Sequence, residues 1–109
     1  MIQNLLDVSA IQDFSGEVFE TLAAGRSFEL KRIVSSGQCT PPGQLYDQQT
    51  DEWVLLLSGN AQIEFPDSGD LVDLAPGDYL LIPARRKHRV VRTDSEQKTV
   101  WLALYFTDR

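Results

Sequence analysis

The sequence predicts an all-β protein, a barrel or a sandwich built from short strands. Three observations predict this fold class. Segments of about four to eight residues that are apolar, or that alternate apolar and polar side chains, recur along the chain. Residues that favour turns separate them at regular intervals, and no convincing amphipathic helix occurs beyond roughly the first ten residues. About eight or nine strands in this arrangement are typical of closed or layered β folds.

The first part of the chain provides two of the expected strands. Residues 2–10 predict either a short helical turn or an irregular segment, and both readings stay open. Val18 begins an extended run that Gly25 ends, and residues 28–34 then alternate in the manner of a half-buried strand. Residues 38–43 contain two prolines, which cannot donate to a strand ladder, so we expect a loop there.

The middle of the chain predicts a strand that is buried on both faces, followed by a hairpin. In the segment 52–58, residues 53–57 are all apolar, which predicts cover on both sides. Gly59 and Asn60 favour a tight turn, and residues 61–65 alternate as the second strand of a hairpin. Further strands are expected at residues 71–74, 79–82 (also buried), 88–92 and 100–106.

Polar side chains precede the central strand and share one of its faces. Successive strand side chains alternate faces, so Gln48, Glu52 and Val54 lie on one side if the backbone stays extended, with Tyr46 beside them. A carboxylate that enters such a strand needs a partner, because an unpaired buried charge is costly. His88 is the only histidine of the chain and is the partner we expect.

Composition limits the classes of function. A formal net charge of −6 argues against a nucleic-acid binder, because phosphate contacts need a basic surface. No apolar run approaches the roughly 20 residues that span a bilayer, and the N-terminus lacks the pattern of a secretory signal. With a single cysteine in 109 residues, these features predict a cytoplasmic protein in one domain over residues 1–109.

One local exception to the acidic composition surrounds the histidine. Residues 85–87 and 89 are all arginine or lysine. One interpretation is a solvated turn with basic tips. The other is an electropositive rim that draws an anionic small molecule toward His88.

Two spaced motifs resemble those of the cupin superfamily, whose members are small jelly-roll barrels. The first cupin motif is a histidine pair followed by a glutamate and then a glycine. Glu52 and Gly59 keep the spacing of the last two, whereas Tyr46 and Gln48 stand where the histidines would be. This first motif is therefore degenerate in the present sequence.

The second cupin motif is better preserved. It consists of a glycine, a proline and a histidine, and Gly77, Pro83 and His88 match it in type and spacing. Its inner glycine is Arg85 here, and its closing asparagine is Arg92. The resemblance spans about residues 28–106 and implies a jelly-roll barrel with that segment as its core.

The resemblance also implies a site inside the barrel, where cupins hold a divalent metal. It selects Gln48, Glu52 and His88 as metal ligands, and Tyr46 with His88 as catalytic residues. Imidazole and carboxylate groups suit zinc, iron, manganese or nickel. Only one of the family's three histidine nitrogens remains, so weak binding is expected, and the alternative is a metal-free hydrogen-bonded network of the same side chains.

The resulting hypothesis is a small cupin that binds a small anionic molecule, with a divalent metal in the barrel. It includes a metal-dependent enzyme of the oxygenase, isomerase or decarboxylase type, but the sequence does not choose a reaction. The alternative is a non-catalytic binding or structural module without metal. Because small cupins commonly form dimers, the resemblance implies a homodimer in either case.

Overall fold

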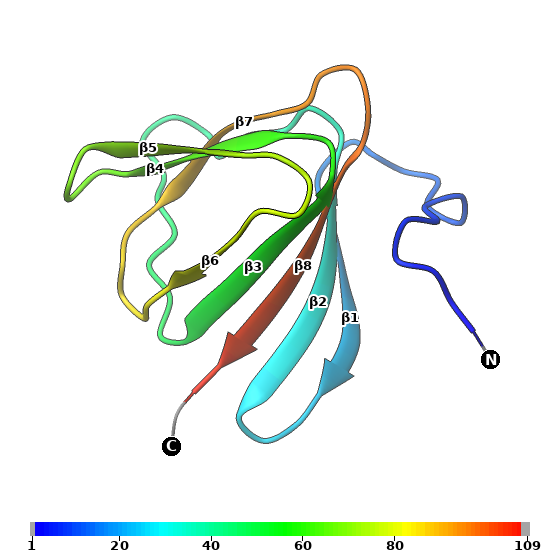
Figure 1. Cartoon of the computed structure of the whole chain (residues 1–109), viewed down its shortest axis with the longest axis horizontal. Helices are drawn as coiled ribbons and strands as arrows, with labels where there is room; N and C mark the ends of the chain where they lie inside the picture. The colour runs from blue at the N-terminus through cyan, green and yellow to red at the C-terminus, as the bar shows by residue number, and fades with distance from the viewer. Residues whose placement is uncertain (1, 108–109) are drawn as a thin grey trace.

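Eight antiparallel strands form two sheets in the computed structural model, which describes residues 2–107 (Figure 1). The strands are β1 (Val18–Ala24), β2 (Phe28–Ser35), β3 (Asp51–Ser58), β4 (Ala61–Phe65), β5 (Asp70–Leu74), β6 (Tyr79–Ile82), β7 (Arg89–Thr93) and β8 (Thr99–Phe106). One sheet has the order β1-β2-β8-β3-β6 and the other β5-β4-β7. The all-β jelly-roll prediction is confirmed. None of the described residues forms a helix that could cross a membrane.

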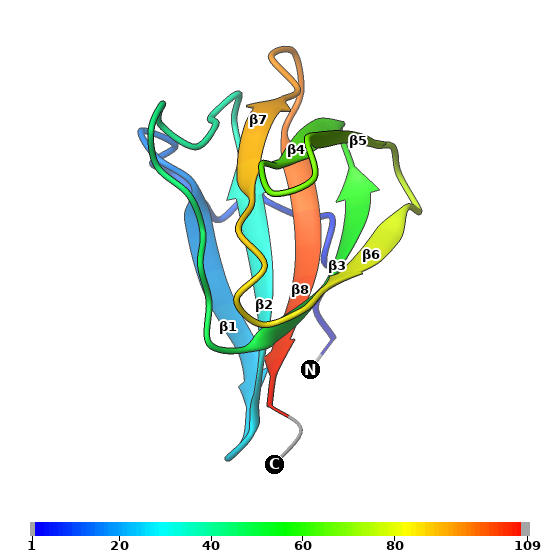
Figure 2. The same ribbon diagram turned by 90° about the vertical axis from the view of Figure 1, so that its left-hand side faces the viewer.

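Strand β3 lies inside the larger sheet and pairs with both β6 and β8. Its first inward-facing residue, Glu52, stands opposite Ile82 on β6 and Tyr105 on β8. Cross-strand partners share a face of the sheet, so these three side chains point to the interior. In Figure 2 the loop that enters β3 and the loop from β6 to β7 lie together at one end of the molecule.

The core occupies the space between the two sheets toward the other end of β3. Val54 and Leu56 are buried there against Ala61, Ile63 and other apolar side chains of the second sheet. Gly59 closes this end with a φ of 83°, and a Cβ on it would lie 2.7 Å from the Cα of Thr99. Only glycine fits a turn that approaches a neighbouring strand this closely.

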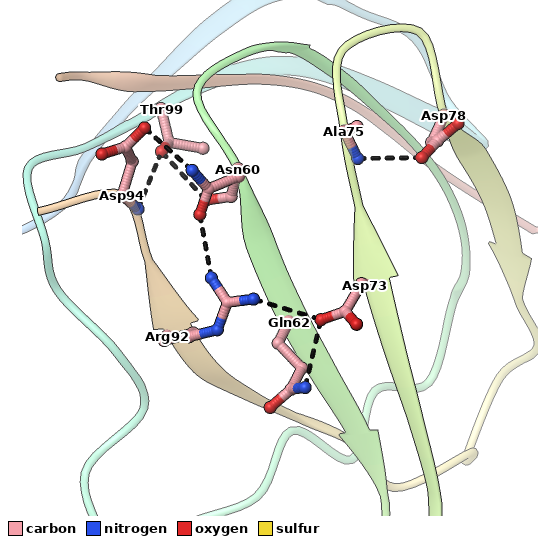
Figure 3. Close-up of polar contacts among 8 residues, drawn as sticks. All are labelled: Asn60, Gln62, Asp73, Ala75, Asp78, Arg92, Asp94 and Thr99. Carbon is pink, nitrogen blue, oxygen red and sulfur yellow. Dashed lines mark hydrogen bonds and ion pairs between the residues drawn. The ribbon is translucent and has the colours of Figure 1, made fainter. Parts of the chain in front are cut away.

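A network of hydrogen bonds between polar side chains connects the strands on the outside of this closed end (Figure 3). The Arg92 guanidinium donates to Asn60 Oδ1 at 2.9 Å and to Asp73 Oδ1 at 3.2 Å. Asn60 Nδ2 in turn donates to Asp94 Oδ2 at 2.9 Å. Arg92, which replaces the asparagine of the second motif, therefore links β7 to β5 and to the β3–β4 turn.

The exposure of the outer face of the larger sheet shows that the predicted burial of β3 and β6 on both faces was wrong. Strand β3 was expected to be covered on both sides, but Trp53 and Leu55 are only half-buried on the outer side. Strand β6 was expected to be buried, yet Tyr79 and Leu81 are 66% and 56% exposed. Apolar residues on both faces of a strand do not say whether the same chain covers them.

The segment before β1 is irregular rather than helical. It contains turns closed by the hydrogen bonds from Asp7 N to Asn4 O and from Ile11 N to Val8 O. Arg32 of β2, which is buried, donates to the carbonyls of Leu5 and Asp7. The same guanidinium holds Glu20 of β1 at 2.6 Å, so one arginine fixes this segment to the sheet.

Candidate functional site

A cavity of about 50 Å³ lies between the sheets, at the end of β3 opposite Gly59. Most of its wall is apolar, but six polar side chains reach it from four strands or their flanking loops: Glu17, Tyr46, Gln48, Glu52, His88 and Tyr105. Four of these are the residues that the sequence selected. The structure therefore brings Tyr46, Gln48, Glu52 and His88 to one place.

Backbone pairing sets the position of His88. Tyr46 and His88 form an isolated β-bridge, with Tyr46 N donating to His88 O at 2.7 Å and His88 N donating to Tyr46 O at 3.1 Å. Their rings stack with centroids 5.3 Å apart. The bridge joins the loop before β3 to the loop before β7, so two distant parts of the chain hold the buried imidazole in place.

The hydrogen bonding of His88 determines which ring nitrogen is free. Nδ1 lies 2.9 Å from the carbonyl oxygen of Arg86, which can only accept a hydrogen bond. Nδ1 therefore carries a proton, and Nε2 is the nitrogen that faces Glu52, with 3.7 Å between Nε2 and Oε1. That distance is too long for a direct hydrogen bond.

Glu52 is buried and accepts a hydrogen bond from the side-chain amide of Gln48 at 3.1 Å. The predicted ligands Gln48, Glu52 and His88 are thus neighbours. In a neutral imidazole with the proton on Nδ1, Nε2 is an acceptor, and so is the Glu52 carboxylate. When the imidazole is neutral, two acceptors therefore face one another in a buried space, which favours a donor or a cation between them, and when it is protonated the two side chains form an ion pair.

Two phenols flank this pair. Burial raises the pKa of Tyr105 far above its ordinary value, and the negative charge of Glu52 adds to the increase. Burial also raises the pKa of Tyr46, with smaller contributions from Glu17 and Glu52. Both hydroxyls therefore stay protonated well into the alkaline range and can donate hydrogen bonds to a bound molecule.

Sequence reasoning did not find Glu17 and Tyr105. Glu17 accepts a hydrogen bond from Ser35 Oγ at 2.6 Å, and Trp101 Nε1 donates to the same Ser35 Oγ at 3.3 Å. Glu17 precedes β1, and only the pairing of Val18 with Val34 brings it to the cavity. No local pattern marks this residue, because its position depends on the register of two strands.

The basic loop does not line the cavity. Arg85 pairs with Asp47 at 3.5 Å, and Arg89 pairs with Glu64 at 3.3 Å. The Arg86 guanidinium lies 4.3 Å from the ring centroid of Phe65. These contacts favour the interpretation of the loop as a turn with basic tips over that of a rim aimed at His88.

The donor set fits a metal ion incompletely. No three His, Cys, Asp or Glu side chains among residues 2–107 lie close enough together to hold one. His88 Nε2 and Glu52 Oε1 supply two donors, and Gln48 directs its amide nitrogen, not its oxygen, at the carboxylate. Catalytic zinc sites commonly have three protein ligands and structural zinc sites four.

The fold and this interior site define a small jelly-roll barrel with a cavity between its sheets that several polar side chains line. The chain belongs to the cupin family, because the family model of the cupin domain matches residues 33–105. A crystal structure of a proposed mannose-6-phosphate isomerase from Ralstonia eutropha is similar, with a TM-score of 0.90 and 38% sequence identity. That match covers 97% of both chains.

Two other solved structures share the fold at lower identity. A cupin superfamily protein from Desulfitobacterium hafniense has a TM-score of 0.73 and 20% identity, covering 90% of this chain and 84% of that one. The polyketide cyclase RemF from Streptomyces resistomycificus has a TM-score of 0.72 and 20% identity, covering 87% and 68%. A search of curated proteins found no match.

Proposed function

We propose that this cupin binds a small anionic molecule that carries a hydroxyl group, with the hydroxyl between His88 and Glu52. The observation that carries the proposal is the 3.7 Å separation of Nε2 and Oε1, which are both buried and are both acceptors when the imidazole is neutral. A hydroxyl between them can donate its one proton either to Nε2 or to Oε1. The 38% identity to a protein named as a proposed mannose-6-phosphate isomerase supports a hydroxylated anion as ligand.

The same residues support proton transfer if the protein is an enzyme. His88 Nε2 is free to take a proton, and the carbonyl of Arg86 fixes its orientation through Nδ1. The raised pKa of Tyr46 keeps its hydroxyl available as a donor. An isomerase-type reaction, in which a proton is moved next to a carbonyl, is the chemistry that this pair suits best.

Binding of a divalent metal is the second candidate function. The two facing acceptors favour it, since zinc, iron, manganese or nickel could lie where a hydroxyl otherwise would. Gln48 would then have to turn its amide oxygen inward as a third ligand. In this case the metal would supply a Lewis acid, and His88 and Glu52 would serve as its ligands.

Binding measurements on three variants test the proposal. Mannose 6-phosphate and each metal alone are added to the protein, and the shift in melting temperature is recorded, because a ligand of the folded state raises stability. We expect a shift with mannose 6-phosphate that is lost in Glu52→Gln and His88→Ala but kept in Glu96→Gln, which changes an exposed carboxylate. A shift that all three variants keep would refute binding at this pair.

Metal uptake is measured on the same variants. Uptake of zinc, iron, manganese or nickel that depends on Glu52 and His88 would establish the second candidate, and its absence after reconstitution would exclude it. Isomerisation of mannose 6-phosphate, followed with the same proteins, separates an enzyme from a binding module. Loss of folding in Glu52→Gln would instead indicate a structural network.

We also propose that the protein is a homodimer, joined through an apolar patch on the outer face of β3, β6 and β8. Register places six side chains in one patch there: Trp53, Leu55, Tyr79, Leu81, Leu102 and Leu104. None is charged, although the chain has a net charge of −6, so a second copy can approach without repulsion at this patch. The cytoplasmic location remains a prediction.

Light scattering tests the dimer with two matched leucines. Leu81 is 56% exposed inside the patch, and Leu71 is 57% exposed on β5, outside it. Leu81→Glu should give a monomer because the new charge would be buried between the copies, whereas Leu71→Glu should leave the dimer intact. A monomeric wild-type protein would overturn the proposal.

A further inference from the structure

A second, larger hollow opens at the mouth of the barrel. Its volume is about 470 Å³, and Tyr46, Gln48 and Tyr105 line both this hollow and the inner cavity. The β1–β2 hairpin, the loop before β3 and Thr107 after β8 form the rest of its wall. A ligand that reaches His88 and Glu52 would therefore extend through the mouth.

Lys31 is an inward-facing cation at the junction of the two spaces. It pairs in register with Ala103, which belongs to the buried core, so both residues face the interior. Its Nζ lies 5.6 Å from the ring centroid of Tyr105 and 6.0 Å from that of Phe19. The two rings hold the ammonium at the entrance. Arg26, at the tip of the hairpin, lines the same hollow.

The two ends of this path differ in charge. The inner cavity contains the carboxylates of Glu17 and Glu52, whose charges disfavour a further anion and raise the pKa values of the nearby phenols. The mouth contains two cations, of which Lys31 is offset by Glu29 at 3.5 Å. Glu29 also accepts a hydrogen bond from the Thr21 hydroxyl at 2.9 Å, so it keeps a partner if Lys31 turns to a ligand.

We propose, on the basis of the function proposed above, that Lys31 and Arg26 form an anion subsite that fixes the orientation of the ligand. The carboxylate or phosphate of the ligand lies at the mouth against these cations, and its uncharged hydroxyl end enters the inner cavity. The substrate class is then a small hydroxylated monocarboxylate or phosphate monoester with the anion at one end.

Nuclear magnetic resonance titration of the full chain tests this subsite. The probes are glycerol 3-phosphate, glycerate and neutral glycerol, which share a hydroxylated chain and differ in the end group. We expect at least one of the two anions to bind more tightly than glycerol and to shift the amide signals of residues 26–31. Which anion binds distinguishes a phosphate from a carboxylate.

Three variants sharpen the test. Lys31→Met should weaken anion binding by about tenfold or more, because a charge-assisted contact is lost. Glu29→Gln should strengthen it, because a competing carboxylate is removed. Lys98→Met is the control, since Lys98 Nζ lies 4.5 Å from the Phe14 ring centroid but does not line the hollow.

Equal anion affinity in wild type and Lys31→Met, or equal affinity for glycerol and the anions, would overturn the subsite. A different result is expected if the subsite exists but the proposed function is wrong. In that case the anion would still shift residues 26–31 in a Lys31-dependent way, but Glu52→Gln would leave the affinity unchanged and no signal near Glu52 would move.

Discussion

The two ends of the barrel interior differ in what their side chains do. Toward Gly59, the inward row of β3 continues with Val54 and Leu56, which are 2% and 0% exposed in a close-packed apolar core. Toward the mouth, the same row begins at Glu52, which is buried beside an imidazole it does not directly bond. Within one strand, a step of two positions leads from a packed core to a buried carboxylate whose Oε1 lies 3.7 Å from His88 Nε2.

This contrast indicates a division of roles along the barrel. Apolar packing at the closed end supplies the free energy of folding, because removing apolar surface from water is the main stabilising contribution. The mouth end can then keep polar groups in positions that add little stability but can bind a ligand. Departures from good local packing are expected at functional sites for this reason.

The largest effect on stability is expected from Leu56→Ala, which tests the closed end directly. Leu56 is fully buried, and truncating such a side chain leaves a cavity that costs about 2–5 kcal/mol of the free energy of unfolding. Urea denaturation measures it. Glu52→Gln at the other end should change stability by about 1 kcal/mol or less, because the new amide can donate to His88 Nε2. Similar losses in the free energy of unfolding of both variants would show that the two ends contribute equally to stability.

A slightly smaller loss is expected from Gly59→Ala. The positive φ strains a non-glycine residue, and the added Cβ would overlap the backbone of Thr99, which together cost about 2–4 kcal/mol. Gly77→Ala is the control, since Gly77 also has a positive φ, of 94°, but a Cβ added there would have no atom within 4 Å. It should lose only about 1–2 kcal/mol. Equal losses would show that the close approach at Gly59 does not matter.

Most of the fold could be predicted because its signals are local. Gly59 with Asn60 marks a turn, and alternation marks residues 61–65 as a strand whatever the rest of the chain does. The outer face could not be predicted, because the sequence of Leu81 and its neighbours does not state whether this chain or a second copy covers them.

The candidate site was predictable to the extent that motifs describe it. Spacing selected Glu52 and His88, and the structure brings them together. Glu17 and Lys31 were not found, because their inward direction follows from the register of β1 with β2 and of β2 with β8. Register is a property of strand pairs and is not visible in either strand alone.

A third and smaller effect concerns alkaline pH at the mouth end. Burial raises the pKa of Tyr105 above the ordinary value of 10.0, so the folded protein keeps a proton that the unfolded chain releases. This contribution to stability is complete below about pH 10 and decreases above it, by at most about 1.4 kcal/mol per pH unit. Denaturation at increasing pH should show a shallower decline in Tyr105→Phe than in wild type. The half-buried Tyr46 should contribute less.

The smallest effect is expected at Arg85, where the loop beside His88 contains backbone strain. Arg85 has a φ of 67° at the position where the second cupin motif has glycine, and its N donates to Gln48 O at 2.7 Å. Arg85→Gly removes a strain of about 1–2 kcal/mol but adds about 0.5–1 kcal/mol of chain entropy in the unfolded state. The exposed pair with Asp47 adds little.

We therefore expect Arg85→Gly to be more stable than wild type by up to about 1 kcal/mol, measured by urea denaturation. Lys87→Gly, two residues along the same loop and without a positive φ, should instead lose about 0.5–1 kcal/mol. If Arg85→Gly gains stability while its affinity for mannose 6-phosphate falls, the strain holds Gln48 and His88 in position for binding. A loss of stability in Arg85→Gly would mean that the strain at Arg85 is smaller than the entropy cost of the glycine and the lost pair with Asp47.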